Sequence, residues 1–199
     1  MPNHNRQCGA VVLAAGGSSR LGQPKQLVEW RGETLLARTA RIALEAACSP
    51  VVVVLGCESG RMQHALAGLD VLTVVNAEWP SGMASSLRTG AAAWSESSPH
   101  GTDVLLLVCD QPQVEAEDLR RLLAVHTSQG RDVTASAYSG RLGVPAVFRR
   151  NLLDELMAIT GDQGARAVIE RHRQQAGILD LPTAAIDVDS PGDLQLIRI

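Results

Sequence analysis

Residues 11–25 read VVLAAGGSSRLGQPK, an apolar run that gives way to a loop rich in glycine and serine. Consecutive aliphatic residues are typical of a strand that is buried on both faces. Glycine bends the main chain where a Cβ would clash, so backbone N–H groups of the loop can turn toward an anion, and Arg20 and Lys25 add positive charge. The stretch therefore predicts a strand followed by a phosphate-binding loop.

The spacing of this loop differs from that of two common phosphate-binding loops. A Walker loop needs Gly-Lys followed by Ser or Thr, and a dinucleotide-binding loop needs G-x-G-x-x-G directly after the strand; the chain has neither pattern here. A tight strand-to-helix turn with solvated charges would explain the glycines and serines equally well. The addition of Arg20, Pro24 and Lys25 favours phosphate binding.

Apolar runs of strand length alternate with amphipathic stretches of helix length along the rest of the chain. This alternation predicts an α/β fold with a mostly parallel sheet and helices on both sides. The expected strands are 8–15, 51–55, 71–75, 104–108, 132–138, 145–148 and 184–188. The expected helices are 34–47, 58–67, 85–94, 115–128, 151–158, 165–174 and one that starts near Pro191.

Composition excludes several classes of protein. The 199 residues are 45% hydrophobic and 20% charged, and no apolar run reaches the roughly 18 residues of a spanning helix, so we expect one domain, residues 1–199, in the cytoplasm and not in a membrane. A net charge of −3 and 3% aromatic residues argue against nucleic acid as a partner. The cysteines at 8, 48, 57 and 109 form no C-x-x-C pair, which argues against a zinc site or a disulfide framework.

Four unusual segments follow predicted strands: 16–25, 76–90, 110–112 and 187–190. Ligands of open α/β sheets bind beyond the carboxyl ends of the strands, so we expect these segments to converge. Asp110 ends an aliphatic run and suits Mg²⁺, which takes one or two carboxylates together with substrate phosphates. A helix cap or a turn would also explain Asp110, and the same alternative holds for Asp187 and Asp189.

Two further groups of polar residues have competing interpretations. Ser85 and Ser86 could cap a helix, and they could also contact a nucleotide. The histidines at 4, 64, 100, 126 and 172 form no cluster with a nucleophile, so we expect them on the surface and expect no Ser-His-Asp hydrolase.

Taken together, the motifs resemble the molybdenum cofactor cytidylyltransferases of the MobA-like NTP transferase superfamily over nearly the whole chain. The resemblance rests on residues 13–20, 24–25, 79–90, 109–112, 143–148, 161–166 and 187–194. It extends more broadly to the enzymes that activate sugar phosphates. It implies a Rossmann-like, three-layer α/β/α nucleotidyltransferase fold.

The same resemblance implies roles for particular residues. Arg20, Lys25 and Asp110 would be catalytic, and Asp110 and Asp189 would hold Mg²⁺. Cytidylyl members read Leu-Ala-Ala-Gly where guanylyl members read Leu-Ala-Gly-Gly, so Ala15 favours CTP. Val144 stands where related enzymes often carry a polar residue. The nucleotide would be bound by Ala14, Ala15, Gly16, Gly17, Lys25 and Ser86.

The expected reaction is transfer of CMP from CTP to a phosphate monoester, with molybdopterin as the expected acceptor and release of pyrophosphate. Such a product would serve a molybdenum hydroxylase as partner. One alternative is a sugar- or alditol-phosphate nucleotidyltransferase, and another is a noncatalytic module or chaperone that binds nucleotide or molybdenum cofactor. An NAD-dependent dehydrogenase would need the glycine pattern that the chain lacks.

Overall fold

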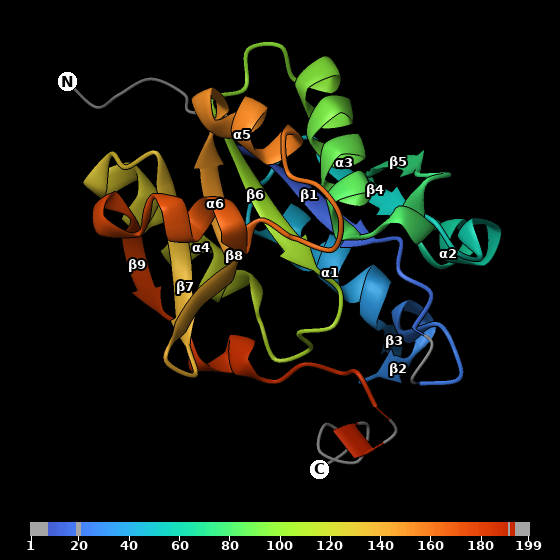
Figure 1. The fold of residues 1–199 in the computed structure, drawn as a ribbon. Coiled ribbons are helices and arrows are strands. Elements are labelled where there is room, and N and C mark those ends of the chain that lie inside the picture. Colours follow the sequence, from blue (N-terminus) through green and yellow to red (C-terminus); the bar gives the residue numbers. More distant parts are fainter. Residues whose placement is uncertain (1–7, 19–20, 191, 194–199) are drawn as a thin grey trace.

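The computed structural model describes residues 8–18, 21–190 and 192–193, which contain a seven-stranded sheet and a small two-stranded sheet (Figure 1). Along the large sheet the strands lie in the order β5-β4-β1-β6-β8-β7-β9. Their bounds are β1 Cys8–Ala14, β4 Val51–Leu55, β5 Leu72–Val75, β6 Asp103–Val108, β7 Val133–Tyr138, β8 Arg141–Arg149 and β9 Gly177–Asp180. The small sheet pairs β2 Glu29–Trp30 with β3 Glu33–Thr34.

The large sheet is mostly parallel, as the alternation of strands and helices predicts. Strands β5, β4, β1 and β6 run parallel to one another, and β7 runs parallel to β9. Only β8 is antiparallel to its neighbours, because a two-residue turn connects it to β7. Both turn residues, Ser139 and Gly140, have positive φ, the conformation that matches the twist of a tight hairpin.

Helices cover both faces of the sheet and make the three layers of a Rossmann-like fold (Figure 1). Alternate strand residues supply the two cores: Ala10 and Val12 of β1 pack on one side, and Val11 packs on the other. The first side is covered by α1 Leu35–Glu45, α2 Ser59–Ala65 and α4 Ala116–Gln129, and the second by α3 Met83–Ser97, α5 Leu153–Met157 and α6 Arg166–Arg171.

Helix α3 lies unusually close to the sheet. A Cβ at Gly90 would stand 2.5 Å from Val11 and 2.8 Å from Val54, so only glycine allows this approach. The close packing holds the first turn of α3 against the carboxyl ends of β1 and β4.

The predicted strand at 184–188 is wrong. Pro182–Ala185 forms a 3-10 turn, and the last strand is β9, which the sequence analysis missed. The backbone around Val188 bonds to the loop after β6 and not to a strand of the sheet. Val188 N–H donates to Asp110 C=O at 2.9 Å. The expected helices after 150 are shorter: the 3-10 turn Arg150–Leu152 precedes α5, and the 3-10 turn Arg173–Gln175 follows α6. Pro191, where a final helix is expected, lies outside the described residues.

A third apolar cluster lies beside the small sheet. Val188 is fully buried there against Trp30, and Ile186 packs at its edge. The other members are Leu21, Val28 and Leu35. The cluster joins the end of the first loop to the carboxyl-terminal segment.

The expectation of surface histidines is wrong for His126. This side chain is 1% exposed, its Nδ1 lies 2.9 Å from Thr134 Oγ1, and its Nε2 lies 3.1 Å from Asp103 Oδ1. Position 126 follows Leu119 and Leu122 on the buried face of α4 at helical spacing, and this periodicity in the sequence marks it as a buried position. His64 and His100 are exposed, His172 is partly exposed, and His4 lies outside the described residues.

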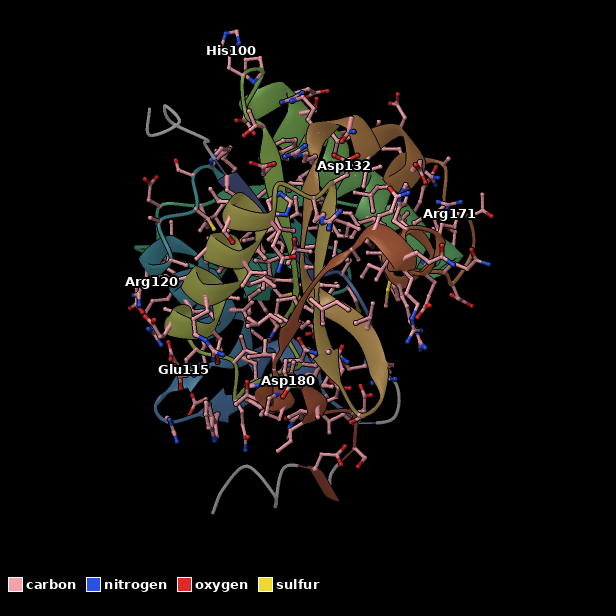
Figure 2. The ribbon with its side chains drawn as sticks, turned by 90° about the vertical axis from the view of Figure 1, so that its left-hand side faces the viewer. His100, Glu115, Arg120, Asp132, Arg171 and Asp180 are labelled. Atoms are coloured by element: carbon pink, nitrogen blue, oxygen red, sulfur yellow. The ribbon has the colours of Figure 1, made fainter. Side chains whose placement is uncertain are left out.

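Side chains of both charges lie on the side of the molecule that Figure 2 shows, among them Glu115, Arg120, Asp132, Arg171 and Asp180. Glu115 and Arg120 lie at the α4 side, and His100 stands at the tip of the loop between α3 and β6. Within the described ranges, we find no helix long and apolar enough to cross a membrane.

Candidate nucleotide site

A cavity of about 410 Å³ opens where β1 and β6 end. Residues from four separate parts of the chain line it: the first loop, the start of α3, the end of β6 and the loop before α6. The lining residues are Leu13, Ala14, Ala15, Gly16, Gly17, Lys25, Gln26, Trp79, Pro80, Gly82, Met83, Ser86, Val108, Cys109, Asp110 and Asp162. Three of the four segments that we expected to converge therefore meet in one cavity.

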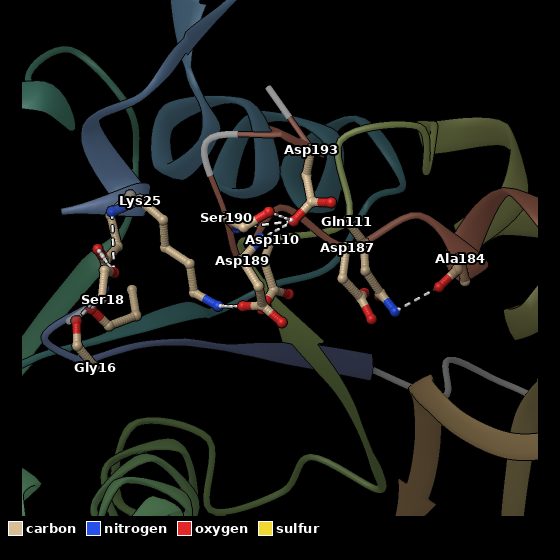
Figure 3. A network of polar contacts seen from close by, with 12 residues as sticks. Gly16, Ser18, Lys25, Asp110, Gln111, Ala184, Asp187, Asp189, Ser190 and Asp193 are labelled. Atoms are coloured by element: carbon tan, nitrogen blue, oxygen red, sulfur yellow. Dashed lines mark hydrogen bonds and ion pairs between the residues drawn. The ribbon is translucent and has the colours of Figure 1, made fainter. Parts of the chain in front are cut away.

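Lys25 links the cavity to the fourth segment (Figure 3). Its Nζ lies 2.6 Å from Asp110 Oδ2 and 2.7 Å from Asp189 Oδ1. The Lys25 and Asp110 side chains are 19% and 18% exposed, whereas that of Asp189 is 53% exposed. The structure thus brings together Lys25, Asp110 and Asp189, which lie far apart in the sequence.

The backbone explains why Asp189 reaches this place. Val188 is anchored twice, through its buried side chain and through its N–H bond to Asp110. Gln111 Nε2 adds a bond to Ala184 C=O at 2.9 Å. Because the residues beside Val188 cannot enter the apolar cluster, Asp187 and Asp189 are held near Asp110. Asp110 is not a helix cap, since the helix after β6, α4, begins at Ala116 with Glu115 as its N-cap.

The charges of the site perturb its ionisable groups. Burial opposes the charge of Lys25, but contact with Asp110 and Asp189 outweighs burial and raises the Lys25 pKa above its usual value. Burial also raises the pKa of Asp187 to about 6, assisted by repulsion from Asp110 and Asp189 and opposed by Arg141. Lys25 is therefore charged at neutral pH.

The carboxylates fit a hard divalent cation. Asp110 Oδ1 is buried and has no hydrogen-bond partner, so one ligand oxygen is free beside the oxygen that Lys25 contacts. In the part of the chain that the structure describes, no three His, Cys, Asp or Glu side chains gather into a group that could hold a metal ion. One or two carboxylates are what Mg²⁺ uses when substrate phosphates complete its shell. The donor set suits a metal that arrives with phosphate.

The first loop forms the floor of the cavity. Ala14 and Ala15 are 2% and 3% exposed, and Gly17 leaves room for the Trp79 ring, which a Cβ there would meet at 3.2 Å. The Ala15 methyl packs close to Gly56, whose own Cβ would stand 2.8 Å from it. Arg20, expected to contact phosphate, lies outside the described residues.

Ser85 and Ser86 do not cap α3. The N-cap is Gly82, whose φ of +112° suits glycine, and both serine hydroxyls accept hydrogen bonds from Asn76 Nδ2 at 2.8 and 3.0 Å. Ser86 lines the cavity, as expected of a nucleotide contact. Asn76 directly follows β5, and its side-chain amide fixes the orientation of both serine hydroxyls.

Sequence reasoning assigned no role to Trp79, Met83 or Asp162, which all line the cavity. Trp79 and Met83 belong to the segment 76–90 and could have been noted as apolar residues in an otherwise polar loop. Asp162 is placed by a contact that the sequence does not announce, because Ala84 N–H donates to the neighbouring Gly161 C=O at 3.1 Å. Gln26 was also missed, although it directly follows Lys25.

Related proteins share the sequence pattern over most of the chain. Nicotine blue oxidoreductase of Paenarthrobacter nicotinovorans is 36% identical over 181 residues, which cover 86% of this chain and 84% of that protein. A probable molybdenum cofactor guanylyltransferase of Nostoc sp. is 29% identical over 197 residues, which cover 95% of this chain and 89% of that protein.

A solved structure has the same fold. Rv0371c from Mycobacterium tuberculosis H37Rv superposes with a TM-score of 0.80 at 32% identity, over 98% of this chain and 100% of that one. Its complex with manganese superposes with a TM-score of 0.75 at 29% identity, over 96% and 97% of the two chains. A family model described as the MobA-like NTP transferase domain matches residues 10–176. The chain therefore belongs to the family of MobA-like NTP transferase domains.

Proposed function

We propose that this protein transfers CMP from CTP to a phosphate monoester, with molybdopterin as the acceptor and pyrophosphate as the second product. The observation that carries the proposal is the placement of Lys25 between Asp110 and Asp189, beside a glycine-rich loop. These groups supply a cation for the triphosphate and oxygens for a metal at one edge of one cavity.

The chemistry needs positioned charge more than a general base. A phosphate monoester has a second pKa of about 6, so at neutral pH it already carries the charge needed to attack the α-phosphorus of CTP. The new P–O bond forms as the bond to pyrophosphate breaks. Lys25 would contact the triphosphate, and Arg20 would join it on the evidence of the sequence. Asp110 and Asp189 would hold Mg²⁺, which neutralises charge on the phosphate oxygens.

The base preference rests on Ala15. The Ala15 methyl packs over Gly56 at the floor of the cavity. Guanylyl-type sequences have glycine in place of Ala15. The remaining nucleotide contacts are proposed to come from Ala14, Gly16, Gly17 and Ser86, which line the same cavity. The cavity of about 410 Å³ suits a small ligand.

The acceptor is proposed from the relatives. One relative is named for molybdenum cofactor guanylyl transfer, and the reaction proposed here differs from that name in the base. We place the reaction in the cytoplasm, where a molybdenum hydroxylase would receive the product.

The test is an assay of pyrophosphate release by the purified protein with Mg²⁺. Each of CTP, GTP, UTP and ATP is combined with each of three acceptors: molybdopterin, a sugar phosphate and an alditol phosphate. We expect release with CTP and molybdopterin. Release with a sugar phosphate or alditol phosphate alone would reject the molybdopterin acceptor. Release with GTP in place of CTP would reject the role of Ala15, and release in no combination would reject the transferase.

Removing the Asp110 carboxylate should abolish most of the activity. Asp110→Ala is expected to lower nucleotidyl transfer by at least about 100-fold, the scale of losing one preorganised electrostatic group. Asp132→Ala is the matched control, because Asp132 pairs with Arg149 at the opposite end of the strands. Turnover of Asp110→Ala near that of the control would remove Asp110 from the site.

A redox reaction is a second candidate, favoured by the relative named nicotine blue oxidoreductase. A cavity that suits a nucleoside triphosphate could also admit a nicotinamide dinucleotide, although the chain lacks the G-x-G-x-x-G loop of NAD-dependent dehydrogenases. The test is loss of reduced nicotinamide absorbance when the protein is mixed with a reduced nicotinamide dinucleotide and nicotine blue. Loss of this absorbance in wild type and in Asp110→Ala alike would support the redox reaction over transfer.

A further inference from the structure

Gln26 lies beneath the first loop and is almost completely buried, with 1% of its surface exposed. Its Nε2 donates to Ala14 C=O at 2.8 Å and to Gly16 C=O at 2.7 Å. A side-chain amide carries two N–H donors, so each carbonyl receives one of them. Its Oε1 accepts from Ser18 Oγ at 3.3 Å. The whole amide is therefore engaged by the loop.

These bonds fix the direction of two peptide groups. The cis peptide bonds in the described chain are Ser49–Pro50 and Val144–Pro145, so the peptides after Ala14 and Gly16 are trans. In a trans peptide the N–H points opposite to the C=O. With both carbonyls held by Gln26, the N–H groups of Ala15 and Gly17 face away from Gln26.

The turn that carries Gln26 also ties the end of the loop to its beginning. Ser18, which has a φ of +49°, accepts from the backbone N–H of Lys25 at 3.0 Å. Gln26 is the next residue, so the side chain that orients Ala14 and Gly16 is carried by the backbone that places Lys25. Loop direction and lysine position are thus set by one short 3-10 turn, Lys25–Leu27.

We propose that Gln26 is a positioning residue for the nucleotide. It holds the loop with peptide N–H groups already directed and Lys25 already placed, so that the triphosphate need not order the loop when it binds. Its amide acts through Ala14 and Gly16 and has no donor left for the ligand. The proposal rests on the proposed function for the identity of the ligand, and on the two hydrogen bonds for the role of the residue.

Two variants remove the donors while keeping the length of the side chain, Gln26→Met and Gln26→Glu. Thr134→Val is the control, because it removes another buried hydrogen bond, to His126, away from the cavity. Amide hydrogen exchange of the peptide 13–18 is measured without ligand. Calorimetry with CTP and steady-state kinetics then give Kd, KM and kcat.

We expect both Gln26 variants to exchange the loop amides about 10-fold faster and to raise Kd and KM for CTP about 10-fold, the scale of losing a buried donor. We expect kcat at saturating CTP to stay within about threefold, and Thr134→Val to change neither exchange nor KM. Exchange and KM within about twofold of wild type would overturn the positioning role. Faster exchange in a protein that binds no nucleotide would support the positioning role and reject the proposed function.

Discussion

Lys25 contacts two carboxylates that come from distant parts of the chain, and the contact leaves the site with an excess of negative charge. Asp110 and Asp189 carry two negative charges against one positive charge. The Asp187 carboxylate, whose pKa is raised to about 6, adds a further negative charge when it is ionised. Arg141 lies 3.8 Å from Asp187 and offsets part of this charge. A divalent cation would reverse this excess and offset part of the negative charge of a polyanion that binds with it.

Removal of the Lys25 charge should strengthen metal binding in the absence of nucleotide. Lys25→Met frees two carboxylate oxygens that the ammonium contacts, so Mn²⁺ affinity should rise about 10-fold, which equals about 1.4 kcal/mol. Titration of the ligand-free protein followed by electron paramagnetic resonance measures it. Arg61→Met is the control, because Arg61 is an exposed cation paired with Glu58. Equal or weaker binding by Lys25→Met would contradict competition between lysine and metal.

Cys109 should resist alkylation although it borders the cavity. Burial, followed by repulsion from Asp110, raises its pKa to about 12, so the reactive thiolate is scarce at pH 8. Iodoacetamide should modify the partly exposed Cys57 in the folded protein and leave Cys109 unmodified, as read by peptide mass spectrometry. Modification of all cysteines in denaturant is the control. Equal labelling of Cys57 and Cys109 in the folded protein would contradict this account.

At the scale of elements, the segment around Val188 completes the site without being a strand or a helix. Its position depends on an apolar side chain and one backbone hydrogen bond. The segment should therefore couple stability to metal binding.

Val188→Ala tests this coupling. Loss of two buried methyl groups should lower the free energy of unfolding by about 2 kcal/mol, and the displaced Asp189 should weaken Mn²⁺ binding. Val168→Ala in α6 is the matched control, since Val168 is equally buried but belongs to the core on the other side of the sheet. Urea unfolding and metal titration measure both effects. Equal Mn²⁺ affinity in the two variants would show that Val188 does not place Asp189.

The elements that sequence predicts well are those with a local signal. Aliphatic runs gave β4 at its observed bounds, and amphipathic spacing gave α1 and α4 to within a few residues. Strand β9 was missed because it has four residues with only two aliphatic side chains, set between Gly177 and Asp180, a pattern that resembles a loop. Residues 184–188 looked like a strand because Ile186 and Val188 alternate with aspartates, but Val188 contacts an apolar cluster and the loop after β6.

The residues of the candidate site also divide into those that the sequence predicts and those that it does not. Connectivity predicted that Lys25, Asp110 and Asp189 would converge, because strand ends of a parallel sheet meet at one edge. Gln26 and Asn76 could not be found this way. Their roles depend on bonds to loop carbonyls and to serine hydroxyls, which appear only when the loops have folded.

At the scale of the whole molecule, we infer that residues 1–199 form one domain. The three tryptophans report on separate regions: Trp30 on the third cluster, Trp79 on the cavity and Trp94 on the buried face of α3. Urea unfolding should therefore give one transition, with tryptophan fluorescence and far-ultraviolet circular dichroism coinciding. Two separated transitions would show that the cluster or the cavity unfolds on its own.

The dependence of Asp189 on Val188 has a consequence for biosynthesis. Lys25 and Asp110 are synthesised before β7, β8 and β9, whereas Val188 and Asp189 are synthesised after every strand of the large sheet. A nascent or truncated chain that ends after β9 would therefore have a folded sheet but only half of its acidic pair. Full metal affinity should therefore be acquired only after Asp189 has been synthesised, and a chain truncated between β9 and Val188 should bind metal more weakly.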